Sequence, residues 1–335
     1  MSQPSPEFDE SLKRVFDHIR NRHHDLPTLP ILSSPQTISD TIAALPITLP
    51  DTGKGLSETT DYLINTLLPG ILQAQNGPRY FGFVVGGVTE SAQLADVLGG
   101  SYDENVQVTL PGVTAATAIE SRTLELVLDL VDIPRERYLG RTITTGATAS
   151  NVLGLGRSLS KRVYTSANRL ACARDHLYSV SPHIPPGYSY AQDGPPSSPT
   201  LPNPPIIILA LHPHYSIQKA ASVVGLGAGP RIIHSIPASP ADELAFDMTY
   251  LRDRLEKEKA VGRGVIVSYG LGEVNTGGIG SDLEEVADLC DELGAWLHVD
   301  AGWSTSRSRS SADKDSIWWF CRIRAWNEPS DKGDG

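Results

Sequence analysis

The feature that most constrains the fold of this chain is a run of six apolar residues at positions 206–211, which reads IIILAL. A short run without any polar residue suits a strand that is buried on both faces, as in a parallel sheet covered by helices. Further strand patterns occupy positions 231–236, 264–269 and 295–300, and a shorter one occupies 141–145. The sequence therefore predicts a mostly parallel sheet.

Amphipathic helix patterns alternate with these strands. We expect helices at 11–22, 114–131, 149–165, 216–226 and 281–294. The last has Ser281 and Glu284 at the spacing of a capping box and Gly294 at its end. Strands that alternate with helices predict an α/β fold, in which ligands gather at the carboxyl ends of the strands.

Composition narrows the classes of function. With 335 residues, 40% of them hydrophobic, the chain can build a large core. Its net charge of −11 is a poor match for nucleic acid or an anionic membrane, and no apolar run is long enough for a membrane span. The start lacks the pattern of a secretory signal. Three scattered cysteines, Cys172, Cys290 and Cys321, predict neither a disulfide framework nor a metal site, so we expect a cytoplasmic protein.

Three regions differ in character. Residues 1–75 are punctuated by prolines and should wrap a larger body or a partner chain. Residues 76–303 carry the strand and helix patterns of a large ligand-binding domain, interrupted by a loop at 181–205 that holds nine of the 25 prolines. Residues 304–335 begin with the low-complexity stretch STSRSRSS and hold three of the five tryptophans. The composition of this tail therefore differs from that of the domain before it.

The first candidate site is the segment 144–151, TTGATASN, between an expected strand and an expected helix. Small residues let backbone amides approach an anion, and a helix N-terminus offers unpaired N–H groups and a favourable dipole. Thr148 and Ser150 add hydroxyl donors. The segment suits a phosphate, although an ordinary strand-to-helix turn capped by threonine would have the same pattern.

Three other candidates lie at the end of an expected strand or just after it. His214 can stack on a flat cofactor ring or relay protons, or it can be a loop histidine with a routine hydrogen bond. Asp300 can hold the nitrogen of a pyridine ring protonated, or it can be a helix cap. The loop 270–278 contains four glycines and can lie close to a ligand, or it can be a flexible connection.

In this order, the segments 146–151, 214–220 (HYSIQKA) and 298–301 (HVDA) resemble the group II decarboxylases that depend on pyridoxal 5'-phosphate (PLP). The resemblance covers about residues 75–303 and implies the aspartate-aminotransferase-like α/β fold, fold type I. It also implies that Ala147 and Thr148 hold the cofactor phosphate, that His214 stacks on the ring, that Asp300 pairs with the ring nitrogen and that Ala301 packs against the ring. The resemblance further implies a homodimer for the full-length form and an amino acid as substrate.

The sequence departs from the family in two places. Glu273 stands where many relatives have threonine. The family lysine that binds the cofactor covalently follows a histidine, whereas the only lysines after Asp300 are Lys314 and Lys332, and neither follows one. Because the resemblance ends at Trp303, we expect a chain truncated before that lysine, without the C-terminal small domain, and a tail that comes from a shifted reading frame or an unspliced intron.

The resemblance implies a carboxy-lyase that releases carbon dioxide from an L-amino acid, with this chain itself expected to be inactive. Two alternatives stay open. The chain could be a non-catalytic protein that holds PLP or pairs with a full-length decarboxylase. It could also belong to another fold type I enzyme, such as an aminotransferase or an aldolase, although the HYS and HVDA pieces favour a decarboxylase.

Overall fold

The computed structural model describes residues 5–82, 87–104, 106, 108–131, 133–135, 141–156 and 173–302. The chain divides into two compact units, Met1–Glu104 and Asn105–Gly335. The first boundary expected from the sequence, at residue 75, stays a prediction, and the expected tail at 304–335 lies outside the described residues.

The described part of the first unit is helical. It contains α1 (Pro6–Asp25), α2 (Pro35–Ala43), α3 (Gly55–Asp61), the π-helix η1 (Tyr62–Leu67), the 3₁₀-helix η2 (Leu68–Gly70) and α4 (Glu90–Tyr102). The first helix begins earlier than the expected residue 11 because Ser5 caps it, accepting a hydrogen bond from the Phe8 amide, and Pro6 occupies its first turn. An ion pair of 2.9 Å joins Arg14 of α1 to Asp61 of α3.

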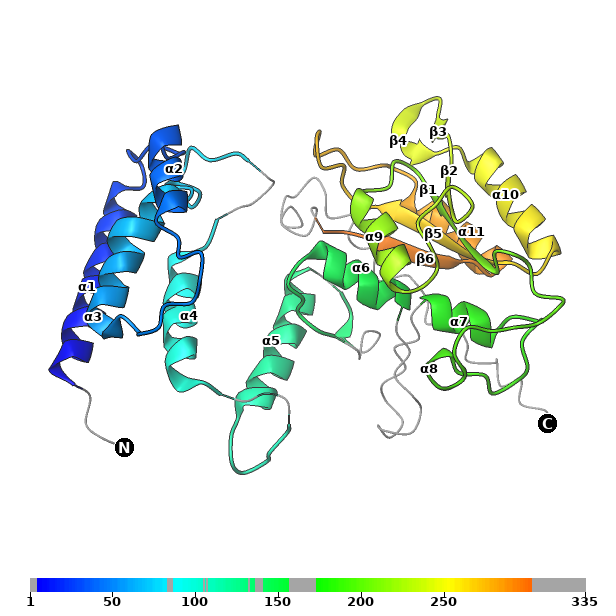
Figure 1. The fold of residues 1–335 in the computed structure, drawn as a ribbon. Coiled ribbons are helices and arrows are strands. Elements are labelled where there is room, and N and C mark those ends of the chain that lie inside the picture. Colours follow the sequence, from blue (N-terminus) through cyan, green and yellow to red (C-terminus); the bar gives the residue numbers. More distant parts are fainter. Residues whose placement is uncertain are drawn as a thin grey trace. The chain divides into compact units, whose positions relative to one another are not determined.

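The second unit is built around a four-stranded sheet (Figure 1). Its strands β1 (Ile206–Ala210), β2 (Ile233–Ser235), β5 (Gly264–Gly270) and β6 (Trp296–Asp300) lie in the order β2-β1-β5-β6 and are all parallel. A small antiparallel hairpin of β3 (Ala238–Ser239) and β4 (Asp242–Phe246) stands beside this sheet. The predicted parallel sheet is therefore confirmed, although residues 141–145, which are described, form no strand.

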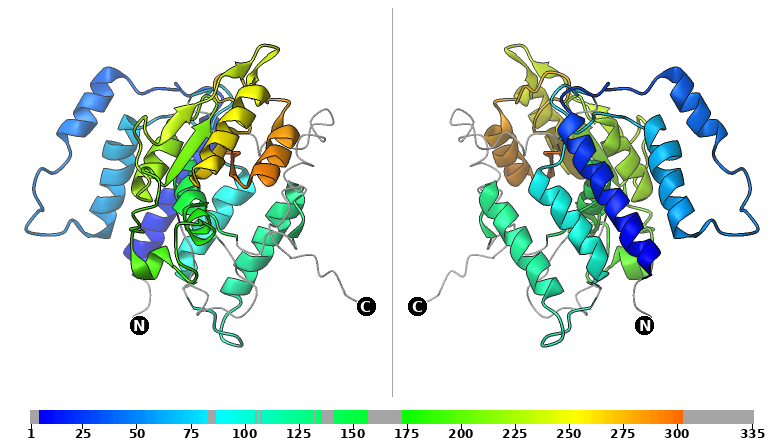
Figure 2. Two further views of the ribbon diagram at one scale, coloured as in Figure 1. Left: turned by 90° about the vertical axis from the view of Figure 1, so that its right-hand side faces the viewer. Right: turned by 90° about the vertical axis from the view of Figure 1, so that its left-hand side faces the viewer.

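Helices cover both faces of the sheet (Figures 1 and 2). On one face lie α10 (Met248–Ala260) and α11 (Leu283–Leu293), which Figure 2 shows side by side and which the Arg252–Glu292 pair joins at 2.7 and 2.8 Å. The other face is covered by α6 (Ala147–Gly156), α7 (Ala173–Ser179) and α9 (Tyr215–Val223). The remaining helices of this unit are α5 (Ala116–Leu130) and α8 (Tyr190–Asp193), the latter inside the expected proline-rich loop.

Strand β1 contributes side chains to the hydrophobic cores on both faces of the sheet, which explains its unbroken apolar sequence. Ile207 and Leu209 join the cluster that includes α10 and α11, while Ile206 and Ile208 join the cluster with α7 and α9. All four side chains are at most 2% exposed. Because successive residues of a strand point to opposite faces, only an all-apolar strand can satisfy two cores. Each buried isoleucine or leucine contributes about 1.5–3 kcal/mol.

One expected helix boundary is corrected, and another stays a prediction. Helix α6 is described only to Gly156, and the rest of the expected helix, to residue 165, lies outside the described residues. The expected cap of α11 by Ser281 is wrong, since the residue before the helix is Asp282 and the Ser281 hydroxyl donates to Asp242 instead, at 3.1 Å. Asp282 does not cap the helix with its side chain either, because its carboxylate bonds to β4 and β5.

Candidate functional site

The candidate site lies at the carboxyl edge of the parallel sheet. Asp300 is the last residue of β6, and His214 comes four residues after the end of β1. The two strands flank β5 in the same direction, so their carboxyl ends share one edge. This is the edge at which open α/β sheets bind ligands.

The N-terminus of α6 reaches the same place. A Cβ built on Gly302 would lie 2.9 Å from the Ala147 Cβ and 3.3 Å from Asp300 Oδ1. The first residue of α6 therefore adjoins the turn that follows β6, and only a glycine at 302 leaves space between them. Thr148, half-buried in the first turn of α6, and Ala301, between Asp300 and Gly302, belong to the same neighbourhood.

Asn151 connects the predicted site residues. This side chain is 3% exposed. Its Nδ2 donates to Asp300 Oδ2 at 2.9 Å and to Ser216 Oγ at 3.1 Å, and Ser216 Oγ lies 2.8 Å from His214 Nδ1. The structure thus brings His214, Asp300 and the start of α6 into one hydrogen-bonded network, which joins three elements far apart in sequence.

His298 completes the network from within β6. Its Nε2 lies 2.9 Å from Asn151 Oδ1, and burial lowers the pKa of the imidazole below its ordinary value, partly offset by the charge of Asp300. Gly154 of α6 makes room for this ring, since a Cβ there would come within 2.9 Å of His298 Cε1. The buried ring supports Asn151 rather than facing a ligand.

Sequence reasoning gave no role to Asn151, Ser216 or His298. A weak signal for Asn151 was available, because it is the one residue with an amide side chain in a helix otherwise made of small and apolar residues, ATASNVLGLG. A polar side chain on the buried face of such a helix needs a partner. Nothing in the sequence indicates that the partners come from β6 and α9.

Two predicted phosphate ligands differ in availability. Ser150 Oγ lies 2.6 Å from the Thr144 hydroxyl, which also donates to the Gly146 carbonyl at 3.0 Å, so the Ser150 hydroxyl braces the turn. Thr148 stays a predicted hydroxyl donor to a phosphate. Ala147 stays a predicted donor through its backbone N–H.

The loop after β5 holds its own acidic side chain. The Glu273 carboxylate accepts hydrogen bonds from the backbone of Asn275 and Thr276 at 3.0 and 2.7 Å, and from the Asn275 amide at 2.6 Å. These bonds lower the pKa of Glu273. The Glu273 carboxylate therefore stiffens the glycine-rich loop.

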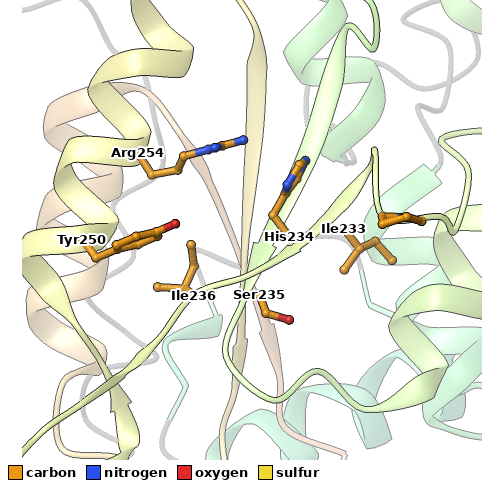
Figure 3. Close-up of a pocket in the computed structure, with 7 residues that line it drawn as sticks. Ile233, His234, Ser235, Ile236, Tyr250 and Arg254 are labelled. Atoms are coloured by element: carbon orange, nitrogen blue, oxygen red, sulfur yellow. The ribbon is translucent and has the colours of Figure 1, made fainter.

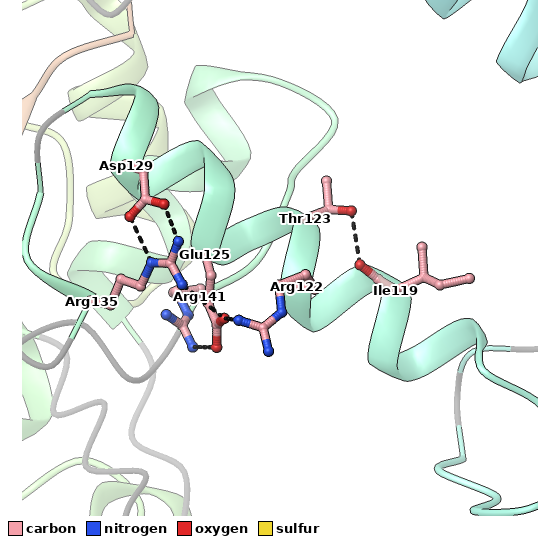
Figure 4. Close-up of polar contacts among 7 residues, drawn as sticks. All are labelled: Ile119, Arg122, Thr123, Glu125, Asp129, Arg135 and Arg141. Carbon is pink, nitrogen blue, oxygen red and sulfur yellow. Dashed lines mark hydrogen bonds and ion pairs between the residues drawn. The ribbon is translucent and has the colours of Figure 1, made fainter.

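An ionic cluster links α5 to the segment that enters α6 (Figure 4). Glu125 pairs with Arg122 at 2.7 Å, Arg135 at 3.3 Å and Arg141 at 3.6 Å, and Arg135 also pairs with Asp129. Arg141 begins the described stretch that leads to Ala147. The Arg141 side chain is only 17% exposed. Its ion pair with Glu125 therefore holds the segment that leads to the candidate phosphate turn.

A hollow lies elsewhere, between β2 and α10 (Figure 3), with a volume of about 310 Å³. Its polar lining comes from His234, Ser235, Tyr250 and Arg254. None of the residues predicted to hold a cofactor lines it. Within the described ranges no cluster of acidic, histidine and cysteine side chains could hold a metal ion. No described helix is both long and apolar enough to cross a membrane.

Comparison with known proteins relates the residues at this edge of the sheet to a protein family. Residues 189–310 match the pyridoxal-dependent decarboxylase conserved domain. That stretch contains His214, Ser216, His298 and Asp300. Over that stretch the chain is similar to a pyridoxal-dependent decarboxylase domain.

Relatives of the chain agree with that match. Human cysteine sulfinic acid decarboxylase is 37% identical over 120 residues, which are 34% of this chain and 23% of the relative. Aromatic-L-amino-acid decarboxylase of Catharanthus roseus is 21% identical over 312 residues, 90% of this chain and 54% of the relative. The chain thus spans about half the length of this second relative.

The fold is also that of solved decarboxylases. The glutamate decarboxylase domain of a Vibrio parahaemolyticus protein superposes with a TM-score of 0.72 at 19% identity, covering 95% of this chain and 63% of that one. The chain therefore has the fold type I architecture expected from its sequence, in which a mostly parallel sheet carries helices on both faces.

The side chains at the carboxyl edge fit the cofactor of this family. PLP has a phosphate, which the N–H groups of a helix N-terminus suit, and a pyridine nitrogen, which a carboxylate holds protonated. The edge offers the start of α6, the Asp300 carboxylate and the exposed His214 ring. The space beside Ala147 depends on the missing side chain of Gly302.

Proposed function

We propose that this chain contributes the PLP-binding part of an amino-acid decarboxylase, a carboxy-lyase that releases carbon dioxide from an L-amino acid. The observation that carries the proposal is the Asn151 network, which joins the start of α6, the carboxylate at the end of β6 and the imidazole after β1. The match to the decarboxylase domain over residues 189–310 supports it independently.

Each proposed ligand has a distinct role. Ala147 and Thr148 bind the phosphate through the N-terminus of α6, and Asp300 holds the ring nitrogen protonated. His214 would stack on the ring, and Ala301 would pack against it. Bound PLP acts as an electron sink when the carboxylate of an amino acid leaves. Asp300 maintains that capacity, because it keeps the proton on the ring nitrogen.

Titration with PLP tests this assignment. We expect saturable binding, followed by the absorbance or fluorescence of the cofactor, and at least tenfold weaker binding in Asp300→Ala, because the charged partner of the ring is lost. Asp253→Ala, which removes a surface carboxylate of α10, should bind like the parent chain. Binding that Asp300→Ala leaves unchanged would contradict the assignment of the site.

Activity is tested by carbon dioxide release. The relatives are named for cysteine sulfinic acid and for aromatic L-amino acids, and the Vibrio structure for glutamate, so these three classes form the substrate panel. Borohydride treatment of the PLP complex, followed by peptide mapping, identifies any lysine that holds the cofactor. Labelling of Lys314 or Lys332 would show that the tail supplies it.

The alternatives have their own signatures. Saturable PLP binding without carbon dioxide release and without a labelled lysine would favour a non-catalytic protein that holds PLP or pairs with a decarboxylase. Amino transfer to a keto acid, without carbon dioxide release, would favour an aminotransferase of the same fold.

We further propose a cytoplasmic homodimer. Four apolar side chains of α1 support a second copy as the partner, since they are 38–45% exposed in the described chain: Phe8, Leu12, Val15 and Phe16. Exposed apolar side chains gathered on one helix favour a protein interface. Light scattering should give twice the mass of the chain, and a monomer of unchanged fold would contradict the proposed dimer.

A further inference from the structure

The buried network around Asn151 donates its hydrogen bonds in one direction, and only the consequence of that direction at the cofactor ring rests on the proposed function. The amide of Asn151 has one orientation that satisfies all its neighbours. Its Nδ2 faces two oxygens, Asp300 Oδ2 and Ser216 Oγ, while its Oδ1 faces the ring nitrogen His298 Nε2. The reverse orientation would set oxygen against the carboxylate.

The amide orientation determines the hydroxyl orientation. Both hydrogens of Asn151 Nδ2 are used, one on Asp300 and one on Ser216. Ser216 Oγ therefore accepts from Asn151, and its single hydrogen is free to point along the 2.8 Å contact to His214 Nδ1. Ser216 is fully buried, so its hydroxyl has no water partner in competition.

The hydroxyl in turn determines the histidine tautomer. His214 is the residue before α9, and its Nδ1 also accepts from the Ser216 backbone N–H at 3.3 Å. Two donors point at Nδ1, so this nitrogen carries no hydrogen of its own. The hydrogen of the neutral ring is then on Nε2, the nitrogen on the far side from Ser216.

From this relay we infer that Asn151 is a positioning residue: through one buried chain of hydrogen bonds it orients the Asp300 carboxylate and fixes the Nε2–H tautomer of His214. Both groups are thereby prepared before any ligand arrives. When a ring binds between a donor and a carboxylate that are already oriented, these two side chains lose less conformational entropy. In the proposed enzyme the imidazole stacked on the cofactor would carry an N–H donor at Nε2.

The tautomer can be measured without cofactor. Long-range nitrogen–proton NMR spectra of a chain labelled with ¹⁵N distinguish the two ring nitrogens, and loss of one signal set in His214→Gln assigns the residue. We expect the Nε2–H form in the parent chain. A hydrogen on Nδ1 of His214 would overturn the inference, whether or not the chain binds PLP.

Variants test the relay itself. Ser216→Ala removes the hydroxyl donor, and Asn151→Ala frees that hydroxyl to turn away, so both should give a mixture of tautomers at His214. Ser222→Ala, an exposed serine of α9, should keep the Nε2–H form. If circular dichroism shows that either alanine variant is unfolded, Ser216→Thr keeps a hydroxyl and should keep the tautomer. An unchanged tautomer in folded Ser216→Ala and Asn151→Ala would overturn the relay.

PLP titration separates this inference from the proposed function. Asn151→Ala should bind PLP about tenfold more weakly, the loss expected when one partner of a buried polar group is removed. If the parent chain has the expected tautomer but binds no PLP, the proposed function fails and the relay stands. If PLP binds equally well to Asn151→Ala, the positioning role is overturned while the proposed function survives.

Discussion

The Tyr269 hydroxyl lies 2.9 Å from Asp282 Oδ1, and both residues are buried. The same carboxylate accepts the Phe246 backbone N–H through its other oxygen, at 2.6 Å. One aspartate thus ties β5, the end of β4 and the start of α11. Burial, the negative charge of Asp282 and the hydrogen bond to it raise the pKa of the Tyr269 phenol well above its ordinary value, so the hydroxyl remains a donor.

Replacing Tyr269 by phenylalanine should destabilise the second unit by about 1–3 kcal/mol, because one oxygen of a buried carboxylate loses a partner. Urea unfolding followed by circular dichroism measures the change. Tyr102→Phe is the matched control, since Tyr102 is 80% exposed and should shift the free energy of unfolding by less than about 0.5 kcal/mol. Equal effects of the two substitutions would show that the Asp282 contact contributes little.

The sequence predicted the sheet because its strands are simple in pattern. An all-apolar strand such as β1 has few alternatives, and the parallel order follows from the helices between strands. The cap of α11 was predicted wrongly for a physical reason. Local spacing favoured Ser281, but Asp282 is held by Phe246 and Tyr269, two residues distant in sequence whose positions only the folded sheet defines.

The candidate site was predictable in part for the same reason. His214 and Asp300 follow strand ends, which sequence periodicity locates, and Thr148 follows a recognisable turn. Asn151 and His298 were not predictable as a pair, because their contact joins residues 147 positions apart across two elements. Local rules identify which side chains face an edge of the sheet, whereas tertiary packing decides which of them are connected.

Gly154 and Gly99 give a matched test of that packing. Gly154→Ala should destabilise the chain by about 1–3 kcal/mol, since the new methyl group would push the His298 ring away from Asn151. Gly99→Ala, within α4, meets no atom within 4 Å and should stabilise by about 0.5–1 kcal/mol through helix propensity. Thermal unfolding compares the two. Opposite shifts are the expected result, and a stabilising Gly154→Ala would contradict the tight contact.

The three arginines around Glu125 make that carboxylate the centre of the α5 cluster. Glu125→Gln should cost about 1–2 kcal/mol at low salt and less at high salt, because the guanidinium groups would then repel one another. Glu120→Gln on the same helix is the control, since Glu120 is exposed and has no ion pair within the described part of the chain. A Glu125→Gln effect that does not change with salt would indicate packing instead of charge.

The buried imidazole of His298 predicts how stability depends on pH. Burial lowers its pKa in the folded chain below the ordinary value of 6.5, and burial lowers the pKa of His176 in the same direction. As the pH falls through 6.5, the unfolded chain takes up protons that the folded chain does not, so the free energy of unfolding decreases. The stability is fully present above 6.5 and is lost progressively down to the lowered pKa values, by at most about 1.4 kcal/mol per pH unit for each histidine.

Urea unfolding at several pH values between about 5 and 7.5 measures this dependence. The window lies above 3.8 and 4.5, the ordinary pKa values of aspartate and glutamate, from which hydrogen bonds lower the pKa values of Asp129, Asp242, Glu273 and Glu292. His298→Gln keeps a donor near Asn151 but cannot be protonated, so its stability should fall less steeply towards low pH. His24→Gln, an exposed histidine of α1, should keep the parent slope. An imidazole that is charged and solvated in the folded chain would not make stability depend on pH in this range. Parallel curves of stability against pH for the parent and His298→Gln would therefore show that His298 is not buried against Asn151.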